Sequence, residues 1–166
     1  TASGGSCVIH IRFTPGTVGV RTATLNIADS DPNSPQQAQL NGNGVLANVT
    51  AAPNPVAFAA RIVNTTSSAL TVTVTNTGTL AATLAAASPV TIIGANAGDF
   101  AIVGGTTTCL ANLVLTAGGG SCVVNVTFTP GASGARAATL NVLDDAPASP
   151  QQTALTGTGQ TPPTAD

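Results

Sequence analysis

The chain has 166 residues, and only 6% of them carry a charge: four arginines and six aspartates, with a formal net charge of −2. It contains no Lys, Glu, Met, Trp or Tyr, and His10 is its one histidine. This inventory leaves little for acid–base catalysis and excludes Schiff-base chemistry and a phosphate-binding Walker lysine. A weakly acidic chain with scattered arginines also lacks the basic patch that nucleic acids or anionic lipids require, so neither is expected as a partner.

With 43% hydrophobic residues and little net charge, the chain is expected to fold. No apolar run approaches the roughly 20 residues that span a membrane, so membrane insertion is not expected. Neither a signal peptide nor an initiator methionine is visible. We therefore expect a processed product or a segment of a longer protein.

An internal repeat organises the sequence. Residues 4–44 align without a gap to residues 119–159 at an offset of 115, and 24 of the 41 positions are identical by direct comparison. Residues 45–159 therefore read as one complete copy, and residues 1–44 as the C-terminal half of a preceding copy. Residues 160–166 are a short Pro-containing linker or tail.

The half copy is expected to hold three strands, at residues 7–14, 20–28 and 36–40. Three strands with one apolar face are marginally stable alone, and their open edges need covering. The cover would come from upstream sequence or from another molecule. Because each chain has one first half and two second halves, exchange of whole halves between identical chains always leaves one second half uncovered. A segment of a longer tandem array is the simpler reading, although one donated strand can also build a filament.

The complete copy shows the period-two alternation of half-buried strands. In residues 69–76 the apolar positions are Leu70, Val72 and Val74, and in residues 122–129 Cys122, Val124, Val126 and Phe128 face inward. Residues 135–143 continue the pattern, with Ala138, Leu140 and Val142 on the inner face. A short strand is expected at 151–156, with weaker candidates at 56–59, 80–86, 90–93, 99–103 and 113–115. This predicts an all-β, immunoglobulin-like β-sandwich in tandem, with essentially no helix.

The run GGGSCVVNVTFTP (residues 118–130), followed by ATLNV (138–142), Asp144-Asp145, Ser149-Pro150 and LTGTG (155–159), resembles the bacterial choice-of-anchor D repeats. These repeats are similar to the ASPM–SPD-2–Hydin group of immunoglobulin-like domains. Residues 69–78 (ALTVTVTNTG) belong to the same resemblance, which covers nearly the whole chain. It implies a non-enzymatic module that occurs in tandem in large bacterial surface and secreted proteins.

The cysteines bear on the compartment. The family resemblance implies that Cys109 and Cys122 form a disulfide, which would place the protein in an oxidising, extracellular environment. The alternative is two buried thiols. Cys7 is the repeat equivalent of Cys122, and its partner at the same offset would precede residue 1. It is left to pair between chains, to pair with upstream sequence, or to remain a free thiol in a truncated chain.

Other candidate sites are weak. Asp29 and Asp31, and likewise Asp144 and Asp145, lie in equivalent loops where spaced carboxylates are able to bind Ca²⁺, but a polar Asp/Pro turn explains them as well. His10, expected beside Arg12 on an outward face, has no second histidine or glutamate with which to build a catalytic or zinc site. Three Asn-x-Thr triplets, at Asn48, Asn64 and Asn125, match the glycosylation signal but arise readily by chance in a Thr-rich chain.

No catalytic residues, metal or cofactor are expected. The first hypothesis is a structural module of a bacterial extracellular fibre, stalk or surface protein, whose partners are neighbouring repeats or copies of itself, head to tail. The second is an adhesin or ligand-binding module, which the lack of Trp and Tyr disfavours. The third is a spacer in a secreted multidomain enzyme.

Overall fold

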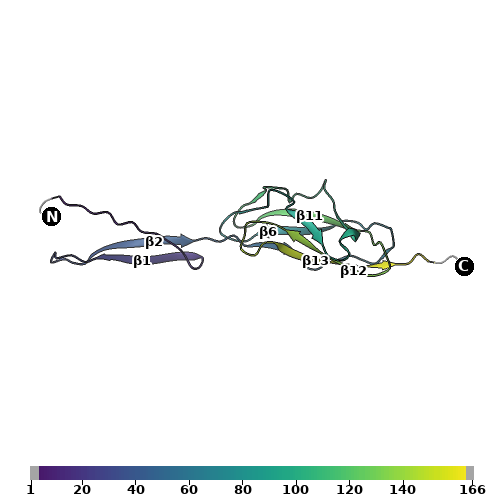
Figure 1. The fold of residues 1–166 in the computed structure, drawn as a ribbon, viewed down its shortest axis with the longest axis horizontal. Coiled ribbons are helices and arrows are strands. Elements are labelled where there is room, and N and C mark those ends of the chain that lie inside the picture. The colour runs from purple at the N-terminus through teal and green to yellow at the C-terminus, as the bar shows by residue number, and fades with distance from the viewer. Residues whose placement is uncertain (1–3, 164–166) are drawn as a thin grey trace. The chain divides into compact units, whose positions relative to one another are not determined.

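The computed structural model describes residues 4–163, which divide into two units between Val45 and Leu46. In Figure 1, β1 and β2 belong to the N-terminal unit, and β6, β11, β12 and β13 belong to the C-terminal unit. The N-terminal unit contains strands β1 (Gly19–Ile27) and β2 (Gln36–Gly44), which pair antiparallel as a hairpin. The C-terminal unit is a two-sheet sandwich of short strands. Its only helix within the described residues is the three-residue 3-10 turn η1 (Ala97–Asp99).

The first sheet of the sandwich has four antiparallel strands in the order β3-β6-β11-β9. Its central pair, β6 and β11, consists of the two segments whose alternation is clearest in the sequence. The bounds of the four strands are β3 (Val49–Ala52), β6 (Leu70–Asn76), β11 (Gly120–Phe128) and β9 (Phe100–Ile102).

The second sheet has the order β4-β13-β12-β8, and β5 also pairs with β13. Strands β4 and β5 lie parallel to β13, whereas β12 is antiparallel to both of its neighbours, β13 and β8. The bounds are β4 (Val56–Ala57), β5 (Arg61–Ile62), β8 (Val90–Ile93), β12 (Gly134–Val142) and β13 (Gln151–Gln160). A separate pair, β7 (Ala82–Thr83) and β10 (Val114–Leu115), completes the unit.

The core lies between the two sheets and follows the predicted alternation. The expected inward side chains are buried: Val72, Val74, Cys122, Val124, Val126, Phe128, Ala138, Leu140 and Val142. Leu70, at the start of β6, is instead 38% exposed. At the centre of the core three phenylalanine rings meet, with Phe128 at 4.9 Å from Phe100 and 5.6 Å from Phe58 between ring centroids. Phe58 follows β4, Phe100 begins β9 and Phe128 ends β11, so this cluster connects distant parts of the chain.

The all-β sandwich predicted from the sequence is confirmed, with three local differences. Strands β3 and β5 were not predicted. Strand β3 is made mostly of small residues, and β5 has two residues, so neither shows an alternating pattern. The expected strand at residues 7–14 is wrong, because the described part of this segment has no strand pairing. Its equivalent, β11, owes its ladder to β6 and β9, and the described residues of the N-terminal unit include no counterpart of either.

The internal repeat is also present in the strand pairing of the two hairpins, β1–β2 and β12–β13. Gly19 pairs with Gly44, and Gly134 pairs with Gly159; every later pairing of the two hairpins also matches after addition of 115. The turns match as well. In each hairpin the Ser-Pro peptide is cis, and the serine hydroxyl accepts a hydrogen bond from the aspartate N–H that opens the turn. The same sequence pattern thus builds the same hairpin twice.

Candidate functional site

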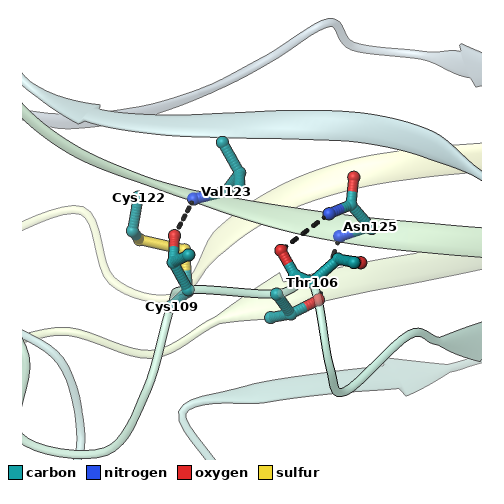
Figure 2. Close-up of a disulfide and its surroundings, with 7 residues drawn as sticks. Thr106, Cys109, Cys122, Val123 and Asn125 are labelled. Atoms are coloured by element: carbon teal, nitrogen blue, oxygen red, sulfur yellow. Dashed lines mark hydrogen bonds between the residues drawn. A yellow bond between two sulfur atoms is a disulfide. The ribbon is translucent and has the colours of Figure 1, made fainter.

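The disulfide is the clearest feature that the sequence singled out. Cys109 and Cys122 are bonded, with their Cα atoms 5.1 Å apart, and both are buried. Cys122 lies on β11, and Cys109 ends a loop that runs alongside this strand (Figure 2). The bond therefore attaches the loop that contains Cys109 to β11, an inner strand of the first sheet.

Hydrogen bonds hold the same loop along β11. The Thr108 hydroxyl accepts from the N–H of Val123, and the Thr107 hydroxyl accepts from the N–H of Asn125. The Asn125 amide donates to the Thr106 carbonyl at 2.8 Å (Figure 2). Consecutive threonines thus satisfy backbone groups of β11 beyond the reach of β9, and they cover the strand edge.

The four aspartates proposed as calcium ligands each accept a hydrogen bond from a backbone N–H, and three of these bonds are local turn contacts. Asp29 and Asp144 each accept a hydrogen bond from the backbone N–H two residues later, and Asp31 does the same. Asp145 accepts from the Thr83 N–H at 2.8 Å. Asp29, Asp31 and Asp144 therefore behave as in Asx turns, whereas Asp145 connects its loop to β7. Among residues 4–163 no three His, Cys, Asp or Glu side chains cluster as metal ligands, and the calcium hypothesis gains no support.

Burial raises the pKa of the Asp144 carboxyl, and the neighbouring Asp145 carboxylate raises it further. The hydrogen bond from the Ala146 N–H opposes this shift by stabilising the charged form. The Gln151 side chain beside it also lowers the pKa, although neither the second carboxyl oxygen of Asp144 nor the Gln151 amide nitrogen, both buried, meets the geometry of a hydrogen bond. The folded turn thus removes solvation from the carboxyl group, and this makes stability depend on its ionisation.

The remaining candidates are dispersed. His10 and Arg12 are exposed, and they do not lie on a strand as expected. Of the three glycosylation triplets, Asn48 and Asn64 are exposed, whereas Asn125 is half-buried and its amide is bonded to Thr106. Cys7 is an exposed free thiol.

Two buried polar arrangements were not predicted from the sequence. Asn76, at the end of β6, is fully buried: its amide nitrogen donates to the carbonyls of Leu80 and Leu115, and its oxygen accepts from the N–H groups of Asn48 and Gly78. The Asn-Thr-Gly signature indicates a turn here but does not reveal that the side chain is its centre.

The second arrangement is an ion pair. Asp99, which is 9% exposed, accepts from the Arg136 guanidinium of β12 and from the Gly131 N–H. It thereby joins η1 to the second sheet. The two residues lie far apart in the sequence, and no spacing pattern links them.

The N-terminal unit carries a groove of about 450 Å³. Its walls come from the segment before β1 and from both strands of the hairpin, with Ile11, Phe13, Arg21 and Leu40 among the lining residues. Apolar side chains that a sandwich would bury are open to solvent here. This surface is the most distinctive candidate for an interaction.

The fold defines an immunoglobulin-like, all-β sandwich module with a disulfide, preceded by an N-terminal unit whose groove exposes apolar side chains. No helix among residues 4–163 is long and apolar enough to cross a membrane. The sequence matches no family model and no curated protein sequence.

Among the solved structures that match this chain, two are similar to it at low identity. The ASH/PapD-like domain of human CEP192 (PapD-like domain 7) matches with a TM-score of 0.45 and 17% identity, over 72% of this chain and 89% of that one. The VesB protease of Vibrio cholerae matches with a TM-score of 0.45 and 14% identity, over 70% of this chain but 32% of the protease.

Proposed function

We propose that the chain is a non-enzymatic structural module of a bacterial extracellular fibre, stalk or surface protein, joined head to tail to further copies of the same repeat. The observation that carries the proposal is the repeat itself. Two hairpins 115 residues apart share sequence, turn hydrogen bonds and strand register. A polypeptide that repeats its structural unit along the chain builds linear, open-ended arrays.

The construction of the complete copy supports a mechanical role. The disulfide joins β11 to the loop beside it, and a central phenylalanine cluster draws on three separate segments. A disulfide persists in oxidising compartments, which favours an extracellular location. The polar side chains with the clearest structural roles, Asn76 and the Asp99–Arg136 pair, are engaged with the fold rather than presented to a substrate.

An antibody raised against the chain, used for immunogold electron microscopy of the source cells, tests the proposal. We expect label on extracellular filaments or on the cell surface, and an intact mass under non-reducing conditions that corresponds to several linked repeats. Label restricted to the cell interior would contradict the proposal. Specific, saturable binding of the isolated chain in a glycan array would instead favour an adhesin.

A further inference from the structure

The hairpin of the N-terminal unit is built like its counterpart, but the apolar side chains of the segment that precedes it are uncovered. Ile9, Ile11 and Phe13 are 46%, 52% and 51% exposed. Their repeat equivalents in the complete copy, Val124, Val126 and Phe128, are each 0% exposed. Since the sequence and the hairpin register are shared, the difference lies in what covers the face.

The complete copy shows what that cover is. Strand β6 pairs along β11 and places Val72 opposite Val124. The ring of Phe128 packs against Phe58 and Phe100. All of these covering residues lie between positions 45 and 118, the first half of the copy, and none belongs to the repeated hairpin segment.

Charge gives a second, independent indication. Arg136 pairs with Asp99, which also belongs to the first half. Arg21 is the repeat equivalent of Arg136, and in the described N-terminal unit its guanidinium reaches only the Val18 carbonyl, at 3.5 Å. It lines the apolar groove without a carboxylate partner among residues 4–163.

The cysteines repeat the relationship. Cys122 is bonded to Cys109 of the first half, whereas Cys7, the equivalent of Cys122, is exposed and free. The apolar side chains of residues 9–13, the charge of Arg21 and the thiol of Cys7 thus all lack the partners that their equivalents have in the complete copy. The one segment type known from this chain to supply all three is the first half of a copy.

We propose that the exposed face of the N-terminal unit docks a polypeptide segment with the sequence pattern of residues 45–118, in the register of the complete copy. A strand equivalent to β6 pairs with residues 7–11 and sets its Val72 equivalent opposite Ile9. The equivalent of Asp99 neutralises Arg21, and the equivalent of Cys109 bonds to Cys7. Residues 45–118 of the chain itself already cover residues 119–159, so the occupant is a further copy of the segment. This proposal rests on the head-to-tail function proposed above, and it identifies the contact that would join successive repeats.

The bond at the joint needs an oxidant. Two thiols, of Cys7 and of the incoming Cys109 equivalent, lose two protons and two electrons to a small-molecule disulfide such as oxidised glutathione. That oxidant is reduced to two thiols, so the step balances.

The test is an extended chain in which a second copy of residues 45–118 is joined directly before Gly4, oxidised with glutathione and compared with the native 166-residue chain. We expect Cys7 to become unreactive and to map by mass spectrometry to the added Cys109 equivalent. Amide exchange in residues 8–13 should slow by about tenfold or more, as for a strand that enters a ladder. Reactive Cys7 with unchanged exchange would overturn the proposal.

Matched variants separate docking from simple cross-linking. In the added segment, Val72→Asp places a charge on the face that meets Ile9 and should abolish the protection, whereas Thr73→Asp, on the exposed face of the same strand, should preserve it. Cys7→Ser in the extended chain should leave residues 8–13 protected, because the strand pairing and the apolar face remain. Loss of protection with Cys7→Ser would contradict docking in this register.

Two further outcomes are informative. If the native chain alone forms oligomers in which Cys7 is already buried, a second whole copy covers the face and the proposal is wrong. If docking fails in the extended chain while immunogold labelling still finds extracellular fibres, the head-to-tail joint proposed here falls and the structural function stands. If docking occurs but no extracellular label is found, the docking proposal stands and the proposed extracellular function is wrong.

Discussion

Phe128 packs its ring so closely against Gly157 that a β-carbon at position 157 would lie 2.6 Å from two of the ring carbons. The same relationship recurs 115 residues earlier, where a β-carbon at Gly42 would lie 2.6 Å from the ring of Phe13. The two rings differ in their freedom to respond. Phe128 is fully buried among other rings, whereas Phe13 is half exposed.

This difference predicts unequal effects of one substitution. Gly157→Ala should lower the free energy of unfolding by about 1–3 kcal/mol, because the buried ring has no space into which to move. Gly42→Ala should change it little, because the Phe13 ring is free to turn toward solvent. Denaturant unfolding of both variants checks this, and equal losses would contradict it. In the extended chain described above, Gly42→Ala should become as costly as Gly157→Ala.

The disulfide should be a main source of stability. Its cysteines are 13 positions apart, and in the chain-entropy model a loop of this size contributes about 3 kcal/mol. The double variant Cys109→Ala, Cys122→Ala should lose roughly that amount in chemical denaturation without burying a new polar group. Cys7→Ser, at an exposed thiol, serves as the control and should unfold like the native chain. A double variant of native stability would show that the Thr106–Thr108 hydrogen bonds alone hold the loop.

The sequence predicted those parts of the fold that depend on local alternation. Strands β6, β11 and β12 each carry a period-two row of apolar residues, and each formed where that row lies. The segment at 7–14 carries the same row and did not form a strand, because a ladder requires partners that alternation does not supply. The disulfide between Cys109 and Cys122 was predicted from the family resemblance. The internal repeat predicted that the two copies share a structure, and both contain the same hairpin. The Asp99–Arg136 pair and the buried role of Asn76 depend on long-range packing, which no spacing along the chain encodes.

Asn76 provides a prediction about buried polarity. Its side chain satisfies two backbone carbonyls and two backbone N–H groups, and it is fully buried. Asn76→Ala should cost at least about 1–3 kcal/mol, the penalty for one unsatisfied buried group, because several groups lose their partner together. Thr73→Ala, an exposed position on the same strand, should cost far less. Similar melting temperatures for the two variants would contradict this reading.

Asp144 makes stability depend on pH. Its pKa is raised in the folded state, mainly by burial and further by the Asp145 carboxylate, so ionisation is less favourable there than in the unfolded chain. The group's contribution is therefore greatest below the unfolded value of about 3.9 and is lost as the pH rises through the higher folded pKa. Asp144→Asn should remove this loss. The free energy of unfolding of the variant should therefore rise relative to that of the native chain as the pH increases. Asp145→Asn should weaken the effect without abolishing it, because burial is the larger cause. An NMR titration of the Asp144 carboxyl measures the shift directly, and a pKa at or below the unfolded value would contradict the prediction.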